Sequence, residues 1–350
     1  MKEEVKALWK LCFEDNEKFT NLYFSMRYKD EINVAIKENG EVISALQMIP
    51  YPMTYCNRII PTSYISGACT HPDFRVKGVM KHLLAEAFQK MYDNKVLLTT
   101  LIPAEEWLFA YYNKVGYTLA FDYSTELVDT ETLSSSEKFN IICDNDFNPE
   151  VFNYFSHKMM ERPVCLQHTE EDFNVILADL KLEGGKLFIA QTDSDICGLV
   201  ICISEGKTLH VMELFAEQDS IKNTLLSCAA KKTHATKIRL IVPPCSKDCK
   251  GLGMARIINA EEMLRIYAAT YPKLDINFNL VDPIIEANNG HFNINHGIVK
   301  RIFTKQSDVT INEVTVQKLT QALLGYKTAE LAGKLNSFAN ENPYMSLMLN

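Results

Sequence analysis

The sequence predicts an α/β (α+β) fold: two tandem domains, each with a mixed central sheet flanked by helices, and then a smaller α+β domain. Short apolar runs that suit strands alternate with segments whose apolar residues recur every three or four positions. This order of elements occurs twice, the second time more faintly, and the last part of the chain changes to the alternation of an antiparallel sheet. We therefore expect three domains, at residues 1–130, 131–250 and 251–350.

The composition excludes several classes of function. The chain has 350 residues, 47% of them hydrophobic and 23% charged, which is ordinary for a globular protein. A net charge of −8 and the lack of a basic stripe argue against a nucleic-acid partner. No apolar signal region opens the sequence, and the longest apolar run, Ile196–Ile203, is too short to span a bilayer, so we expect a cytoplasmic protein with no membrane partner.

The ten cysteines indicate neither a disulfide framework nor a metal site. Most of them lie in apolar periodic segments, where a free cysteine behaves as a small hydrophobic residue, so we expect reduced thiols. Cys245 and Cys249 could form half of a metal site, but no second pair of ligands follows at suitable spacing. We therefore predict that the protein holds no metal.

The first domain begins with two helical patterns and a hairpin. The helices are expected at residues 4–13 and 17–28, and Asn39-Gly40 joins the strands at residues 33–36 and 42–48. Pro50, Pro52 and Pro61 are expected to bracket a further short strand.

The segment Tyr64–Met91 carries the strongest functional signal. A strand-like run breaks at His71-Pro72, and an R-x-x-G sequence from Arg75 to Gly78 leads into an amphipathic helix. The free N–H groups and the positive dipole end of such a helix can bind a pyrophosphate at the edge of a sheet. A glycine at position 78 lets phosphates approach the main chain. The alternative is an ordinary strand, loop and helix with a glycine at a tight entry.

We call the turn from Arg75 to Gly78, together with the start of the helix that follows it, the phosphate cradle. A second motif comes after it. Val96–Leu101 suits a buried strand, and Glu105–Lys114 suits a helix with acidic residues in its first turn. The sequence from Tyr112 to Tyr117 then reads Y-x-x-x-G-Y and enters another strand near Tyr117–Leu127. The order of strand, helix, glycine turn and strand gives the cradle a defined context.

Together the two segments resemble motifs A and B of the GNAT superfamily of acyl-CoA-dependent N-acetyltransferases. The motif A pattern is Q/R-x-x-G-x-G/A, and this chain departs from it at Met80. The resemblance implies that the main chain of Ala68, Cys69 and Thr70 pairs with the pantetheine arm of acetyl-CoA. It implies that the pyrophosphate is bound by the residues that follow, which are Arg75, Val76, Lys77, Gly78, Val79, Met80 and Lys81.

Residues 131–250 repeat the order of elements without the cradle. Helical patterns near residues 151–160 and 170–180 precede three strands, a helix at 221–231 and a strand at 237–242. The residues before that helix, Ala216–Asp219, contain no R-x-x-G and carry carboxylates that would repel a pyrophosphate. We expect a GNAT-like half that lacks a CoA site and shapes the acceptor pocket.

The last domain combines helices with an antiparallel sheet. Gly251 and Gly253 are interpreted as a plain loop before a helix, because the rest of a dinucleotide fingerprint is missing. Alternating apolar residues then predict strands, with a turn at Asn289-Gly290, a short segment at Val309–Ile311 and a final helix that ends at Gly325.

The three-part layout resembles the enhanced intracellular survival (Eis) family, in which a GNAT domain, a degenerate GNAT domain and a sterol-carrier-protein-like domain follow in that order. The segment that starts at Met254, MARIINAEEML, and the ending from helix to tail look like the third domain of that family. The resemblance implies an enzyme that can form a homo-oligomer.

The resemblance also implies two catalytic residues. Tyr112, at the tyrosine of motif B, would be the general acid that protonates the departing thiolate, although it could instead be a core aromatic residue. The C-terminal carboxylate enters the active site in the Eis family, which gives the role of base or amine anchor to Asn350. A carboxyl group near pKa 3.5 is a poor base, so both roles stay open. The apolar tail before it favours a docked end, and packing for stability alone is the alternative.

We therefore predict an acetyl-CoA-dependent N-acetyltransferase. Its acceptor would be a primary amine on a small polyamine, on an aminoglycoside-like molecule or on a lysine side chain. The alternative is a non-catalytic acyl-CoA or lipid carrier that uses the C-terminal domain. The R-x-x-G sequence and Tyr112 argue against the carrier, because a scaffold needs neither.

Overall fold

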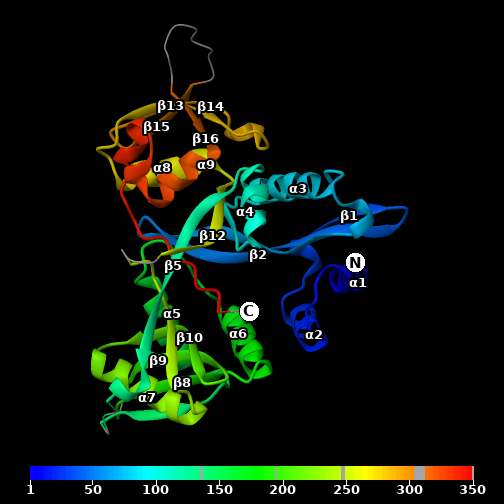
Figure 1. Ribbon diagram of the computed structural model, residues 1–350. Helices are drawn as coiled ribbons and strands as arrows, with labels where there is room; N and C mark the ends of the chain where they lie inside the picture. Colours follow the sequence, from blue (N-terminus) through cyan, green and yellow to red (C-terminus); the bar gives the residue numbers. More distant parts are fainter. Residues whose placement is uncertain (135, 137, 194, 246–248, 303–311, 349–350) are drawn as a thin grey trace. The chain divides into compact units, whose positions relative to one another are not determined.

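The computed structural model describes residues 1–134, 136, 138–193, 195–245, 249–302 and 312–348, and it divides into two compact units (Figure 1). The first unit comprises Met1–Asn16, Arg27–Phe121 and Gly251–Pro343. The second unit comprises Glu17–Met26, Asp122–Lys250 and Tyr344–Asn350. The first unit thus combines most of the predicted first and third domains, whose boundaries stay predictions.

The first unit contains a sheet in the order β1-β2-β3-β4-β12-β5. Its strands are β1 (Asn33–Glu38), β2 (Glu41–Tyr55), β3 (Arg58–Thr70), β4 (Leu98–Leu101), β12 (Lys250–Ile257) and the first residues of β5 (Thr118–Asp129). The pairing of β3 with β4 is parallel, and β1, β2 and β3 form an antiparallel meander. Asn39 and Gly40 both have positive φ, at 52° and 87°, which confirms the predicted hairpin turn.

The parallel strands β3 and β4 are joined through the helix α3 (Val79–Asp93), which packs on β1, β2 and β3. The buried residues of α3 are Leu83, Leu84, Ala87, Phe88 and Met91, as its three-and-four spacing predicts. Each large side chain of this kind contributes about 1.5–3 kcal/mol when fully buried. This stripe fixes the helix on the sheet, and it leaves the start of α3 at the end of β3. The helices α1 (Lys2–Cys12) and α4 (Glu106–Asn113) belong to the same unit.

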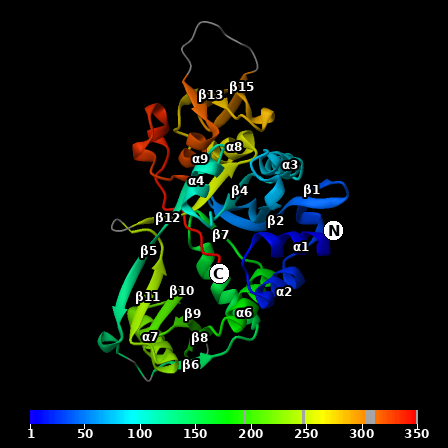
Figure 2. The same cartoon turned by 45° about the vertical axis from the view of Figure 1, so that its right-hand side comes forward.

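The C-terminal part of the first unit forms a smaller sheet in the order β15-β14-β13-β16. The strands are β13 (Ile276–Val281), β14 (Gly290–Asn295), β15 (Ile298–Ile302) and β16 (Glu313–Thr315), packed with α8 (Ala260–Thr270) and α9 (Val316–Leu324). Figure 2 shows these two helices beside the small sheet. Gly325 has a φ of 71° and ends α9 as predicted.

Three details differ from the expectations. Gly251 and Gly253 lie in β12, so the prediction of a plain loop is wrong, because the apolar run that follows them pairs with β4. The tight turn of the small sheet lies at His296-Gly297 and not at Asn289-Gly290. Pro50 and Pro52 were expected to bracket a strand, but they lie inside the long strand β2. The strand β1 no longer pairs with β2 at these positions, so the N–H groups that the two prolines lack interrupt no hydrogen bond to β1. The expected segment Val309–Ile311 lies outside the described residues.

The second unit contains a sheet in the order β5-β11-β10-β9-β8-β6. Its strands are the rest of β5 together with β6 (Asn140–Cys143), β8 (Lys186–Gln191), β9 (Ile196–Glu205), β10 (Thr208–Ala216) and β11 (Lys237–Val242). Its helices are α2 (Glu17–Met26), α5 (Pro149–Met160), α6 (Glu170–Leu182) and α7 (Asp219–Thr233). The strands β10 and β11 are parallel and α7 joins them, so the predicted repeat of the β-α-β order is confirmed.

The chain's last described residues pack in the second unit. Tyr344 forms a bridge with Cys165 of the short strand β7 (Cys165–Leu166), and its backbone N–H donates to the Val164 carbonyl at 2.9 Å. Tyr344 and Met348 belong to the core of this unit. The tail is therefore docked up to Met348. No helix in the described part of the chain has both the length and the apolar character needed to cross a membrane.

Candidate active site

The predicted thioester-binding strand has a free edge. The strand β3 pairs with β4 only from Thr62 to Tyr64, although β3 continues to Thr70 and pairs there with β2. Residues 65–70 therefore have no strand partner on the β4 side, and this stretch includes Ala68, Cys69 and Thr70. An extended ligand could pair with backbone groups on that side, except at the Thr70 carbonyl, which already accepts from Arg75 and Cys12. This fits the pantetheine arm that the sequence predicts for these three residues.

The segment after β3 forms an exposed turn with an unusual backbone. Val76 has a φ of 63° and Gly78 a φ of 80°. Positive φ in a β-branched residue is rare and usually marks a backbone that its surroundings hold in a special shape. A Cβ atom on Gly78 would meet no atom within 4 Å, so this glycine serves the conformation and the approach of a ligand, and no neighbour needs its space.

The backbone amides at the start of α3 point to an anion site. The N–H groups of Val79, Met80 and Lys81 have no acceptor among the described residues, and the first amide with a partner is that of His82, which donates to the Gly78 carbonyl at 3.1 Å. Left-handed residues next to a helix start arrange successive N–H groups into a concave anion site. Arg75, Val76, Lys77 and Gly78 are all exposed, so a pyrophosphate can reach them.

The two cations of the cradle are held in place by local contacts. Arg75 donates from Nε to the Thr70 carbonyl at 3.1 Å, and the Lys77 ammonium lies 5.0 Å from the centre of the Phe74 ring. His71 Nδ1 accepts the backbone N–H of Asp73 at 3.2 Å and starts the short helical turn η2 (Pro72–Phe74). The H-P pair thus sets the path of the chain from β3 to the cradle.

Tyr112 lies in the same unit, near the end of α4. It is 9% exposed, and its ring contacts those of Tyr111 and Tyr117 at centroid distances of 5.5 and 5.7 Å. Burial raises the pKa of Tyr112 well above the ordinary value of a phenol, and Tyr111 and Tyr64 add to the shift. The phenol therefore keeps its proton at neutral pH, as a general acid must. The aromatic contacts also make Tyr112 a member of the core, so both alternatives from the sequence remain.

Tyr64 contributes a further phenol to this region, and it was not among the residues predicted for the site. Tyr64 lies on β3 at the last position paired with β4, and its charge affects the pKa of Tyr112. Burial raises the pKa of Tyr64 to about 12. The only available signal was its position at the start of the strand that precedes the H-P pair.

A buried ion pair supports the glycine turn after Tyr112. Arg256 and Asp282 are 0% exposed as side chains and are joined by a 2.8 Å bond from Nη2 to Oδ1. A Cβ atom on Gly116 would lie 2.5 Å from Arg256 Nη1, and Gly116 has a φ of 92°. The glycine of the Y-x-x-x-G-Y motif is therefore needed for both its conformation and its close approach to Arg256.

The role predicted for Asn350 stays a prediction, because this residue lies outside the described part of the chain. The tail that leads to it is held by several contacts within the second unit. The Ser346 carbonyl lies 2.7 Å from His168 Nε2, and the Arg162 guanidinium carbon lies 4.8 Å from the centre of the Tyr344 ring. Tyr344, Met345, Ser346, Leu347 and Met348 are all at most 9% exposed. We conclude that this tail is docked and not a free end.

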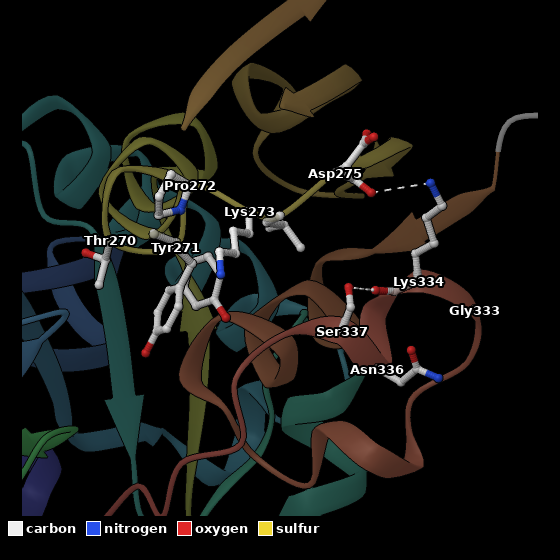
Figure 3. A pocket seen from close by; sticks show the side chains of 11 residues that line it. Thr270, Tyr271, Pro272, Lys273, Asp275, Gly333, Lys334, Asn336 and Ser337 are labelled. Atoms are coloured by element: carbon white, nitrogen blue, oxygen red, sulfur yellow. Dashed lines mark hydrogen bonds between the residues drawn. The ribbon is translucent and has the colours of Figure 1, made fainter. Parts of the chain in front are cut away.

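A cavity of about 670 Å³ lies elsewhere in the first unit, between the end of α8 and the turn η6 (Gly333–Ser337). Figure 3 shows its lining, with Tyr271 and Pro272 on one side and Lys334 and Ser337 on the other. Lys334 donates to the Asp275 carbonyl at 3.3 Å. None of the residues predicted for acyl transfer lines this cavity, so it is a separate feature of the C-terminal segment.

Comparisons with known families agree with the two parts of the first unit. Residues 2–120 match the family model of the acetyltransferase (GNAT) domain, and residues 261–344 match the model of the sterol carrier protein domain. A search of curated proteins found no match.

Three solved structures are similar over nearly the whole chain. A GCN5-related N-acetyltransferase from Anabaena variabilis ATCC 29413 has a TM-score of 0.80 at 16% identity, with 98% of this chain and 96% of that chain covered. Eis1 from Mycobacterium abscessus has a TM-score of 0.77 at 12% identity, with 100% and 97% covered. A conserved protein of unknown function from Enterococcus faecalis V583, described as a probable N-acyltransferase, has a TM-score of 0.76 at 15% identity, with 99% and 96% covered. At these identities the likeness shows the fold.

The domain matches and the fold define the class of protein. The chain is an acyltransferase with a GNAT domain, a class whose acyl donor is an acyl-CoA and whose acceptors are amines. It has the architecture of Eis-type proteins, with a sterol-carrier-like domain at its C-terminal end, so the predicted family resemblance and fold class are confirmed.

Proposed function

We propose that this protein is an acetyl-CoA-dependent N-acetyltransferase that transfers an acetyl group directly to a primary amine. The acceptor is a small polyamine, an aminoglycoside-like molecule or a lysine side chain. The observation that carries the proposal is the run of unpartnered amides from Val79 to Lys81, which follows the left-handed residues Val76 and Gly78 at the end of a half-paired β3. Unpartnered amides occur at every helix start, but an ordinary strand, loop and helix needs neither the left-handed residues nor the unpaired end of β3.

The residues divide the work in the following way. Arg75, Lys77 and the amides of α3 bind the pyrophosphate, and the free edge of Ala68–Thr70 pairs with the pantetheine arm. A backbone N–H of this edge can donate to the thioester oxygen as negative charge develops on it. Whether the donor is acetyl-CoA or a longer acyl-CoA depends on how large an acyl group fits beside this edge.

Tyr112 acts at the end of the transfer. The neutral amine attacks the thioester carbon, the bond between carbon and sulfur breaks, and the phenol gives its proton to the departing thiolate. The ammonium that forms loses a proton to solvent, and the phenolate is reprotonated in turn. The raised pKa keeps the phenol of Tyr112 protonated at the start, but it also makes the phenol a weaker acid, so the position of Tyr112 beside the departing thiolate has to carry the effect.

The test is the release of free CoA from acetyl-CoA in the presence of a panel of amines. The panel contains a polyamine, an aminoglycoside and a lysine peptide, each at several concentrations, with butyryl-CoA as a second donor. We expect amine-dependent release from acetyl-CoA with at least one acceptor, and acetylated product of the matching mass. If hydrolysis alone is seen with every amine and both donors, the proposal is wrong.

The second candidate is the carrier, and the cavity of about 670 Å³ near α8 is the observation that favours it. The cavity is lined by apolar and aromatic groups of Tyr267, Tyr271, Pro272 and Leu274, which could hold an apolar ligand. A thermal-shift comparison of acetyl-CoA with a fatty acid separates the two. Stabilisation by acetyl-CoA alone supports the enzyme, and stabilisation by the fatty acid alone supports the carrier.

A further inference from the structure

Two cysteine thiols meet beside the cradle. Cys12 is the last residue of α1, and Cys69 lies near the end of β3. The Cys12 thiol donates to the Thr70 carbonyl oxygen at 3.4 Å. The side chains of Cys12 and Cys69 are also hydrogen-bond partners. The partners are 57 positions apart in sequence, and the packing of α1 on β3 brings them together.

The surroundings of the pair are positively charged. Arg75 donates to the same Thr70 carbonyl at 3.1 Å, and its guanidinium also hydrogen-bonds the Cys12 sulfur. His71 is the further titratable group that faces this sulfur. The hydrogen bond from Cys69 lowers the pKa of Cys12 to about 6; partial burial opposes this shift and Arg75 adds to it. The same hydrogen bond and burial raise the pKa of Cys69. The shift favours ionisation of Cys12, whereas Cys69 keeps its proton.

The two sulfurs also differ in access. Cys12 is partly exposed, whereas Cys69 is 5% exposed. A small oxidant can thus reach the sulfur that is already ionised, and the second sulfur is protected behind it. By contrast, burial raises the pKa of Cys165 and of Cys202 to about 12, so those thiols are protonated and inert at neutral pH.

We propose that Cys12 and Cys69 form a peroxide-reactive dithiol site, in which Cys12 is the attacking sulfur and Cys69 the resolving sulfur. The Cys12 thiolate attacks one oxygen of the peroxide, the bond between the oxygens breaks, and the departing hydroxide takes a proton to become water. Cys69 then attacks the sulfur of the Cys12 sulfenic acid, and the bond between sulfur and oxygen breaks. The hydroxide takes the Cys69 proton, so two thiols and one hydrogen peroxide give one disulfide and two waters.

The consequence for acyl transfer rests on the proposed function. Cys69 lies on the edge proposed to pair with the pantetheine arm, and Arg75 belongs to the proposed pyrophosphate site. A bond from Cys69 to Cys12 removes the thiolate that Arg75 faces and draws α1 toward this edge. We expect the oxidised protein to bind acyl-CoA at least about tenfold more weakly than the reduced protein, with recovery on addition of dithiothreitol.

The first experiment identifies the disulfide itself. The reduced full-length protein is treated with hydrogen peroxide at pH 7, alkylated, digested without reductant and analysed by mass spectrometry. We expect a peptide linked through Cys12 and Cys69 that disappears on reduction. The Cys69→Ser variant should instead keep a sulfenic acid on Cys12 that dimedone traps, and Cys143→Ser, which removes an exposed thiol, should behave like the natural protein. A linked peptide that is absent, or dimedone labelling that is absent in Cys69→Ser, overturns the proposal.

The second experiment measures the reactivity of Cys12. At pH 6 about half of a thiol with pKa 6 is ionised, against about 0.3% of an ordinary thiol with pKa 8.5, and the lower intrinsic nucleophilicity removes most but not all of that advantage. We expect iodoacetamide to alkylate Cys12 about tenfold faster than free cysteine at pH 6. Equal rates would show that the sulfur is an ordinary thiol and would overturn its role as the attacking group.

Failure of this proposal can be told apart from failure of the proposed function. If the linked peptide forms and acyl-CoA binding is unchanged, the dithiol site stands and the proposed position of the pantetheine arm is wrong. If acyl-CoA binds normally and peroxide gives no linked peptide, only the dithiol site is wrong. The Cys12→Ser variant should bind acyl-CoA like the natural protein and lose the response to peroxide.

Discussion

The two units contain the same β-α-β arrangement, but among the described residues only the first has the features that we propose for an acyl-CoA site. In the first unit α3 joins the parallel strands β3 and β4, and in the second unit α7 joins the parallel strands β10 and β11. Both helices have 15 residues. The difference lies at the helix start: Gly78 before α3 is left-handed, whereas Gln218 before α7 is extended and is followed by an acidic residue, Asp219. The two units therefore share the arrangement of strands and helix, and the conformation at the helix start is what distinguishes the proposed anion site.

The units also differ after the second parallel strand. In the first unit β4 is followed by α4, which carries Tyr112. In the second unit β11 is followed by Pro243-Pro244, and the described residues between β11 and β12 contain no helix. The described residues of the second unit thus contain no equivalent of the proposed cradle or of the proposed acid. The following predictions test whether these two differences are the ones that matter.

The largest expected effect is on stability and concerns the ion pair behind the Gly116 turn. Asp282→Asn removes the charge that faces Arg256, whose side chain is 0% exposed, and should cost about 3–5 kcal/mol of unfolding free energy. The measurement is urea unfolding of the full chain. The matched variant in the second unit is Glu213→Gln, opposite Arg162, which is 16% exposed and can still reach water. We expect Glu213→Gln to lose less unfolding free energy than Asp282→Asn. Equal losses would show that the burial of the arginine does not cause the large effect of Asp282→Asn.

The next effect is on catalysis. Tyr112→Phe should lower kcat by about 100-fold, equivalent to about 2.7 kcal/mol, with acyl-CoA affinity changed by less than about twofold. Because burial raises the pKa of Tyr112, its proton is retained as the pH rises, and the natural enzyme should lose no activity through this group below about pH 10.

The control for Tyr112 lies beside it on the same helix. Tyr111→Phe removes a half-buried phenol from α4 and should change kcat by less than about threefold. A large loss of kcat in Tyr111→Phe with no loss in Tyr112→Phe would show that Tyr111, and not Tyr112, is the general acid. Equal small losses would remove both phenols from the mechanism.

The cradle should have a smaller effect on affinity. Arg75→Ala removes one exposed cation from the proposed pyrophosphate site, and we expect acyl-CoA to bind about tenfold more weakly. The matched variant Lys222→Ala, in the first turn of α7, should have no effect. Titration calorimetry also gives the stoichiometry, for which we expect one acyl-CoA per chain. A second equivalent would mean that the second unit binds the donor without a cradle.

The sequence predicted those parts of the fold that depend on local patterns. The apolar stripe of α3 and the Asn39-Gly40 hairpin follow from spacing and turn chemistry, and both are confirmed. The prediction for Gly251 and Gly253 was wrong because glycines suggest a loop, while the apolar residues after them have a partner strand far away in the sequence. Local signals cannot show which distant strand will pair.

The site was predictable only in part, for the same reason. Gly78 marked the cradle, but nothing about a β-branched residue suggests the left-handed conformation of Val76. Arg256 lies in an apolar run, and its burial depends on Asp282, which is 26 positions later in the chain. Cys12 looked like an ordinary apolar position, and its contact with Thr70 spans 58 positions. The burial of Arg256 and the position of Cys12 depend on contacts that the sequence does not encode locally.

The smallest expected effect is on stability and concerns Glu217, which lies just before α7 in the second unit. Glu217 accepts from Lys158 at 3.0 Å, and this bond lowers the pKa of Glu217. A lowered pKa means that the bond stabilises the fold above the ordinary pKa of a carboxyl group and that this contribution is lost as the pH falls. The Glu217 side chain is 45% exposed, so Glu217→Gln should cost less than about 1 kcal/mol at pH 7, and the cost should shrink as the pH falls.

The same position tests why the second unit should bind no acyl-CoA. If repulsion by carboxylates were the whole cause, the double variant Glu217→Gln with Asp219→Asn would gain a second acyl-CoA in calorimetry. We expect no gain, because Gln218 stays extended before α7, and the backbone there does not form the row of N–H groups proposed for the start of α3. A second equivalent in this variant would show that charge, and not backbone conformation, distinguishes the two units.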